Sequence, residues 1–175
     1  MTNLKVIALD IDLCLVDVIP KWMGYLKSLC TEYDAVKYKK DMLYGQVHYN
    51  LTKYFKLIDG VHGFEFWEQP DLYDKAELMD GAYDVVEELY KAGYEIVFVS
   101  YAFAGHLNSK VDFLKRSFPF ITEDDFHFIS TKSKGFVRAD VIVDDRVSFL
   151  NQMPETTLKL WFQTEYTQDA NIITG

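Results

Sequence analysis

Two pairs of acidic residues stand at the ends of short apolar runs. Asp10 and Asp12 end one run near the amino terminus, and Asp144 and Asp145 end another. Each run is typical of a short buried strand, because aliphatic and β-branched residues continue without polar alternation. Carboxylates at the tips of buried strands are costly unless a cation gathers them. A hard divalent cation with oxygen ligands, most often Mg²⁺ beside a phosphate, is the usual solution, so the pattern predicts a magnesium site.

Strands that alternate with helices are expected to bring these acids together. The pattern predicts strands near residues 4–10, 94–99, 126–130, 139–144 and 157–162, with helices over 81–92 and 106–118. Asp80 is expected to cap the first of these helices, which should bury Val85. Such an order implies right-handed crossovers and a parallel sheet, in which ligands bind beyond the carboxyl ends of the strands. That edge should collect Asp10, Asp12, Ser100, Lys134 and Asp144.

The segment between the first strand and this alternating region reads as a small helical insert. Pro20 suits the first turn of a helix, Trp22 and Leu26 follow at helical spacing, and no strong strand is evident before Asp80. We therefore predict an α/β protein with a Rossmann-like parallel sheet and a small helical cap inserted after the first strand. Residues 1–17 and 80–175 would form the core, and residues 18–79 the cap.

The converging side chains are suited to phosphoryl transfer. Asp10 is the expected nucleophile, which would form an aspartyl-phosphate, and Asp12 the expected acid and base. Ser100 would donate to a phosphoryl oxygen, and Lys134 would supply positive charge. The expected metal ligands are Asp10, the backbone carbonyl of Asp12 and Asp144, with Asp145 acting through a water.

Composition excludes several other classes of protein. The 175 residues carry a formal charge of −9 and the pI is near 4.8, so general adhesion to nucleic-acid polymers or anionic membranes is not expected. No apolar stretch approaches the roughly 20 residues of a membrane-spanning helix. Cys14 and Cys30 show neither metal-site nor disulfide spacing, which favours a reducing cytoplasm, that of a host cell if the gene is viral. A homodimer is left open.

The order of these residues resembles the haloacid dehalogenase superfamily of phosphatases over residues 4–17 and 80–150. The resemblance rests on four short motifs, which are weak singly and strong in this order: Asp10-Ile11-Asp12, Ser100, Lys134 and Asp144-Asp145. The chain looks closest to the 5′(3′)-deoxyribonucleotidases, which carry a helical cap after the first strand. Supporting residues are Phe66-Trp67 before Leu78-Met79-Asp80-Gly81-Ala82, the run 130–134, and the run 139–146.

That resemblance implies hydrolysis of deoxynucleoside monophosphates. The candidate substrate contacts are Phe66 and Trp67, which could stack a base or pack in the core, Tyr101, which could face the substrate or point aside, and Lys132, which could contact the phosphate. The sequence departs from the family pattern at three positions. Leu13 stands where the family has Gly, which puts the turn after the first strand in doubt because Gly allows backbone shapes that Leu resists. Leu15 replaces a small hydroxyl residue, and Tyr101 stands where these nucleotidases tend to carry a second Ser.

Other functions remain open from the sequence alone. The protein could be a phosphatase of another small phosphorylated metabolite, or a degenerate relative that binds nucleotides without hydrolysis. A phosphoacceptor signalling receiver is disfavoured, because no acceptor acid ends the strand at 94–99. Dehalogenation is disfavoured because it does not need the acid supplied by Asp12.

Overall fold

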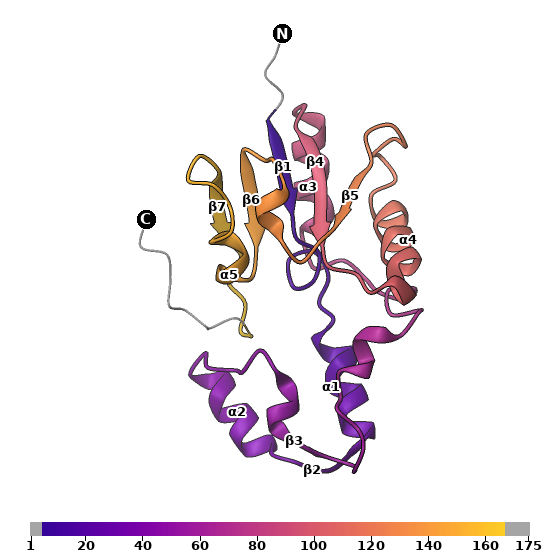
Figure 1. Ribbon diagram of the computed structural model, residues 1–175, viewed down its shortest axis with the longest axis vertical. Helices are drawn as coiled ribbons and strands as arrows, with labels where there is room; N and C mark the ends of the chain where they lie inside the picture. Colours follow the sequence, from indigo (N-terminus) through magenta and orange to yellow (C-terminus); the bar gives the residue numbers. More distant parts are fainter. Residues whose placement is uncertain (1–4, 167–175) are drawn as a thin grey trace.

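A five-stranded parallel sheet forms the centre of the molecule (Figure 1). The computed structural model describes residues 5–166. The strand order is β5-β4-β1-β6-β7, so the first strand lies in the middle. The strands are β1 (Val6–Leu9), β4 (Glu95–Ser100), β5 (His127–Ser130), β6 (Val141–Asp144) and β7 (Leu158–Trp161). The predicted α/β class and parallel sheet are confirmed.

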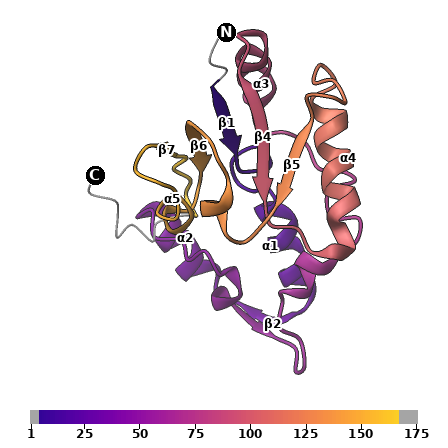
Figure 2. The same cartoon turned by 45° about the horizontal axis from the view of Figure 1, so that its top comes forward.

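Successive side chains of β1 point to opposite faces of the sheet, as strand periodicity requires. Leu9 packs in the larger apolar cluster, together with side chains of α3 (Ala82–Lys91) and α4 (Leu107–Ser117). Ala8 packs in a second cluster, against Leu150 of α5 (Val147–Leu150). The sheet is thus covered from both sides, and Figure 2 shows α4 running alongside β5.

The start of α3 differs from the sequence prediction. Its N-cap is Gly81, with φ of 80°, and no side chain caps the helix, so Asp80 does not have the expected role. Val85 is 56% exposed, whereas Val86 is 1% exposed. The side of α3 that packs against the sheet carries Ala82 and Val86, which are four residues apart. Val85 therefore lies on the side toward solvent.

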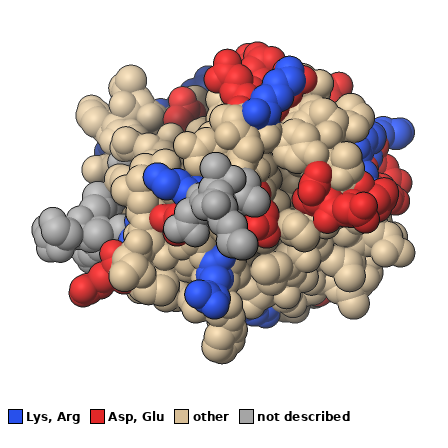
Figure 3. Space-filling view, turned by 90° about the horizontal axis from the view of Figure 1, so that it is seen from above, with Lys and Arg blue, Asp and Glu red and all other residues tan. Residues whose placement is uncertain are grey.

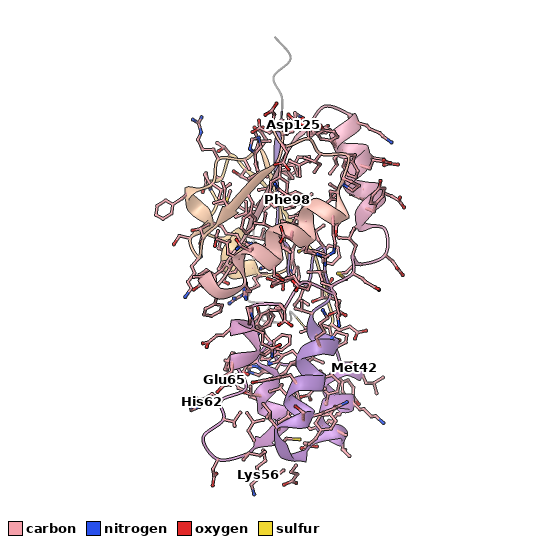
Figure 4. All side chains as sticks on the ribbon, turned by 90° about the vertical axis from the view of Figure 1, so that its right-hand side faces the viewer. Met42, Lys56, His62, Glu65, Phe98 and Asp125 are labelled. Atoms are coloured by element: carbon pink, nitrogen blue, oxygen red, sulfur yellow. The ribbon has the colours of Figure 1, made fainter. Side chains whose placement is uncertain are left out.

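Between β1 and α3 the chain forms a separate group of elements below the sheet (Figure 1). They are α1 (Ile19–Ser28), β2 (Cys30–Tyr33), α2 (Ala35–Leu43), β3 (Phe55–Leu57), and 3₁₀ helices at Leu51–Tyr54 and Glu65–Glu68. The antiparallel pair β2–β3, absent from the sequence prediction, is supported by stacking of Tyr33 on Phe55. In Figure 4, Met42, Lys56, His62 and Glu65 lie in this group, whereas Phe98 lies within the upper core.

The turn after β1 adopts a backbone conformation that favours glycine. Leu13 has φ of 65°, the one positive value at a non-glycine position within residues 5–166. The backbone N–H groups of Cys14, Leu15 and Val16 all donate to the carbonyl of Ile11, which fixes the turn. The Leu13 side chain is 4% exposed, so its burial offsets the cost of the left-handed conformation, about 1–2 kcal/mol.

The end of the molecule away from α1 and α2 carries groups of acidic side chains with Lys and Arg between them (Figure 3). Among the described residues this face has no broad basic patch, in keeping with the net charge of −9. Within residues 5–166 no helix has the length and apolar character needed to cross a membrane.

We predict that Leu13→Gly is more stable than Leu13→Ala by about 1 kcal/mol, because both variants lose the buried side chain but only glycine relieves the positive φ. Leu15, buried in the same turn without a positive φ, is the matched control. There glycine should be less stable than alanine by about 0.5–1 kcal/mol. Urea denaturation of the four variants measures both differences, and the same order at the two positions would contradict the prediction.

Candidate active site

Three neighbouring strands bring their carboxyl ends to one place. β1 lies between β4 and β6, with Leu9 paired to Phe98 on one side and to Val143 on the other. Asp10 and Asp144 come directly after Leu9 and Val143, and Ser100 comes two residues after Phe98. The Asp10 N–H donates to the Val143 carbonyl at 2.9 Å. The convergence predicted from the strand order therefore follows from the parallel register.

Lys134 lies at the centre of this cluster and is 1% exposed. Its Nζ is 2.8 Å from Asp10 Oδ1 and also donates to Asp144. Burial alone would lower the pKa of Lys134, but the neighbouring Asp10 and Asp144 carboxylates outweigh it and raise that pKa above its ordinary value. Lys134 therefore remains a cation held between two acids.

Asp145 has no such partner. Its side chain is buried, and its Oδ2 has no hydrogen-bond partner among the described residues. Ligand atoms of Asp10, Cys14 and Asp145 lie within 4.8 Å of one another. Burial, reinforced by Asp10, raises the pKa of the Cys14 thiol, which keeps it neutral and leaves the two carboxylates as the oxygen donors. The two oxygens of Asp144 are instead bonded to Lys134 and to the Arg146 N–H.

Asp12 is held by residues that the sequence reasoning missed. Its Oδ1 accepts from Tyr73 Oη at 2.7 Å, and its Oδ2 accepts from Lys110 Nζ at 2.7 Å. Ser100 Oγ is 3.3 Å from the same Oδ2. The sequence did carry a signal for Lys110. Phe113 and Leu114 follow it by three and four residues, so all three share one side of α4, and a lysine is unexpected on such an apolar side.

The carboxylates open into a cavity of about 380 Å³. Of the predicted substrate contacts, Trp67, Tyr101 and Lys132 line it, and Lys132 Nζ lies 4.3 Å from the centre of the Tyr101 ring. The structure does not bring Phe66 to this cavity. Phe66 is 3% exposed and packs against Trp22 and Tyr25, so it contributes to the core.

Glu68 and further aromatic and basic side chains also line the cavity. Several come from parts of the chain distant from the acidic residues, so no local sequence signal predicts that they meet there. The aromatic and basic residues are Trp22, Tyr49, Phe64, Phe103, His106, Arg146 and Phe149. Arg146 lies over the rings of Tyr49 and Phe149. One end of the cavity is therefore anionic and suited to binding a cation. The walls offer flat aromatic surfaces, and Lys132 and Arg146 add two positive charges away from the acids.

Comparison with known proteins agrees with this geometry. A family model described as "5′ nucleotidase, deoxy (Pyrimidine), cytosolic type C protein" matches residues 4–171. A protein of Bacillus subtilis (strain 168) named 5′(3′)-deoxyribonucleotidase is 27% identical over 170 residues, covering 95% of this chain and 90% of the relative. A protein of Bacillus phage SPbeta with the same name gives the same values.

Among solved structures, a haloacid dehalogenase-like hydrolase from Burkholderia xenovorans LB400 superposes with a TM-score of 0.57 at 16% identity. The superposition covers 97% of this chain and 87% of that one, so the two share a fold. With the family match spanning nearly the whole sequence, the chain belongs to the deoxy, cytosolic type C family of 5′-nucleotidases and is a phosphoric monoester hydrolase.

Proposed function

We propose that the protein is a magnesium-dependent phosphatase of deoxyribonucleoside monophosphates that acts through an aspartyl-phosphate on Asp10. The observation that carries the proposal is the buried cluster of Asp10, Asp144 and Asp145 at the floor of an aromatic-walled cavity, in which Lys134 pairs with Asp10 and Asp144. The family membership and the names of the two Bacillus relatives support the substrate class.

The cluster is suited to a divalent cation. Lys134 neutralises only one of the three buried carboxylates, and the free Oδ2 of Asp145 has no donor among the described residues. Oxygen donors of this kind suit Mg²⁺, which would add positive charge beside a bound phosphate. Asp10 and Asp145 are the carboxylates that the present geometry leaves for it, while direct ligation by Asp144 and by the Asp12 carbonyl stays a prediction.

Each side chain then has a part in a two-step hydrolysis. Asp10 attacks phosphorus as the ester P–O bond breaks, and Asp12 gives its proton to the departing oxygen. Asp12 next takes a proton from water, whose oxygen bonds to phosphorus as the Asp10–phosphorus bond breaks. Lys134 and the Ser100 hydroxyl stabilise the charge on the phosphoryl oxygens during both steps.

The nucleoside would occupy the aromatic end of the cavity. We propose that residues 18–79 act as the cap, since Trp22 and Trp67 come from this segment and line the same cavity as Asp10. Trp67 and Tyr101 offer ring faces on which a base can stack. Lys132 is the predicted basic contact to the phosphate end of the substrate.

We expect phosphate release that requires Mg²⁺ and is fastest with deoxyribonucleotides, across a panel of ribo- and deoxyribonucleoside 5′- and 3′-monophosphates and sugar phosphates. Asp10→Asn should reduce release by about 10³-fold or more because the nucleophile is lost. Asp84→Asn, on an exposed side chain of α3, is the matched control and should behave as wild type. Unchanged turnover by Asp10→Asn would refute the assigned nucleophile, and a preference for sugar phosphates would refute the substrate class.

Without divalent cations, the free energy of unfolding should fall as pH rises from about 4. Burial, with Asp10 and Asp144 close by, raises the pKa of Asp145, so the folded protein keeps a proton that the unfolded chain has released. The unfolded state then binds fewer protons, and each pH unit in this window costs up to about 1.4 kcal/mol.

Asp145→Asn should flatten this dependence and stabilise the cation-free protein near pH 8, because the amide carries no charge to desolvate. Urea denaturation at several pH values, with EDTA present, measures the slope for wild type and variant. Asp84→Asn should keep the wild-type slope. An equal slope in Asp145→Asn would show that another group carries the pH dependence.

A further inference from the structure

Lys110 is a buried cation outside the cluster around Lys134. It is 0% exposed on α4, although burying an ammonium group is costly unless it is paired and hydrogen-bonded. Lys115 on the same helix shows the ordinary alternative, since it lies at the surface and pairs with Glu123. A buried lysine is therefore expected to have hydrogen-bond acceptors or an anionic partner around its ammonium group.

The contacts of Lys110 account for its burial. Its Nζ donates to Asp12 Oδ2 at 2.7 Å, to Ser100 Oγ at 2.9 Å and to the Tyr101 carbonyl at 3.1 Å. The same atom lies 4.7 Å from the centre of the Tyr73 ring. The three protons of the ammonium thus have three acceptors, two of them side chains of the cluster at the strand ends.

These contacts define the orientation of Asp12. Lys110 holds one carboxylate oxygen and Tyr73 Oη holds the other, while 21% of the side chain stays exposed toward the cavity that Asp12 lines. Lys110 also donates to Ser100 Oγ, whose own hydroxyl donates to the same Asp12 Oδ2 at 3.3 Å. Without Lys110, neither side chain would keep this arrangement, because Asp12 would lose its charged partner and Ser100 a donor.

We infer that Lys110 is a positioning residue that fixes Asp12 for proton transfer to the leaving group. The inference rests on the proposed phosphomonoesterase reaction and deepens it. In that reaction Asp12 in its acid form gives its proton to the departing oxygen as the ester P–O bond breaks, and the carboxylate that remains pairs with Lys110 until water returns a proton to it. A nucleoside alkoxide needs that proton, whereas 4-nitrophenolate leaves readily without it, so the two substrates report on Asp12 differently.

Lys110→Met should therefore lower kcat/KM for a deoxyribonucleoside 5′-monophosphate by about 100-fold or more, which is the typical contribution of a general acid. For 4-nitrophenyl phosphate the loss should stay below about tenfold, because kcat/KM covers only the steps through phosphorylation of Asp10. Lys115→Met, on the same helix but paired with Glu123, is the matched control and should leave both values unchanged.

Tyr73→Phe removes only the hydroxyl that bonds to Asp12 Oδ1, and it provides a second test should Lys110→Met fail to fold. It should show the same selective loss for the nucleotide, by about tenfold. Equal losses for the two substrates, or no loss, would overturn the positioning role of Lys110. A wild-type protein that releases phosphate from neither substrate would instead overturn the proposed function.

Discussion

The repulsion among buried carboxylates is the constraint on which this structure depends. Asp10, Asp144 and Asp145 are each at most 6% exposed, in surroundings where a carboxylate loses most of its hydration. A fold built for stability alone would place apolar side chains at these strand ends. Lys134 offsets part of the cost, and the remaining negative charge favours a divalent cation, which would in turn supply the positive charge that a phosphate ester needs.

The same constraint explains why the site has two lysines with separate tasks. Lys134 lies between Asp10 and Asp144, whereas Lys110 extends from helix α4 and donates to Asp12 and Ser100. Asp10 and Asp12 are only two residues apart, yet each has its own cation. In the proposed reaction, that separation would let Asp10 serve as the nucleophile while Asp12 exchanges protons.

The sequence predicted the parts of the fold that depend on local pattern. Continuous apolar runs marked β1 and β6, and the acids that follow them are close in space because parallel strands end at one edge. Lys110 was missed because its role appears only when α4 packs against the sheet, and Tyr73 because it reaches Asp12 from a segment far along the chain. Phe66 and Trp67 are neighbours on one short 3₁₀ helix, and the sequence could not tell which ring faces the core.

The strained turn at Leu13 bears on how the chain folds. An isolated peptide of residues 10–16 would have little reason to keep a leucine at φ of 65°, because the compensating burial comes from side chains far along the sequence. The turn at Leu13 and the apolar core around it should therefore form together. If they do, Asp10 and Asp12, which lie in the same turn, would be buried only when the rest of the core is in place, including the segments that carry Lys110 and Lys134.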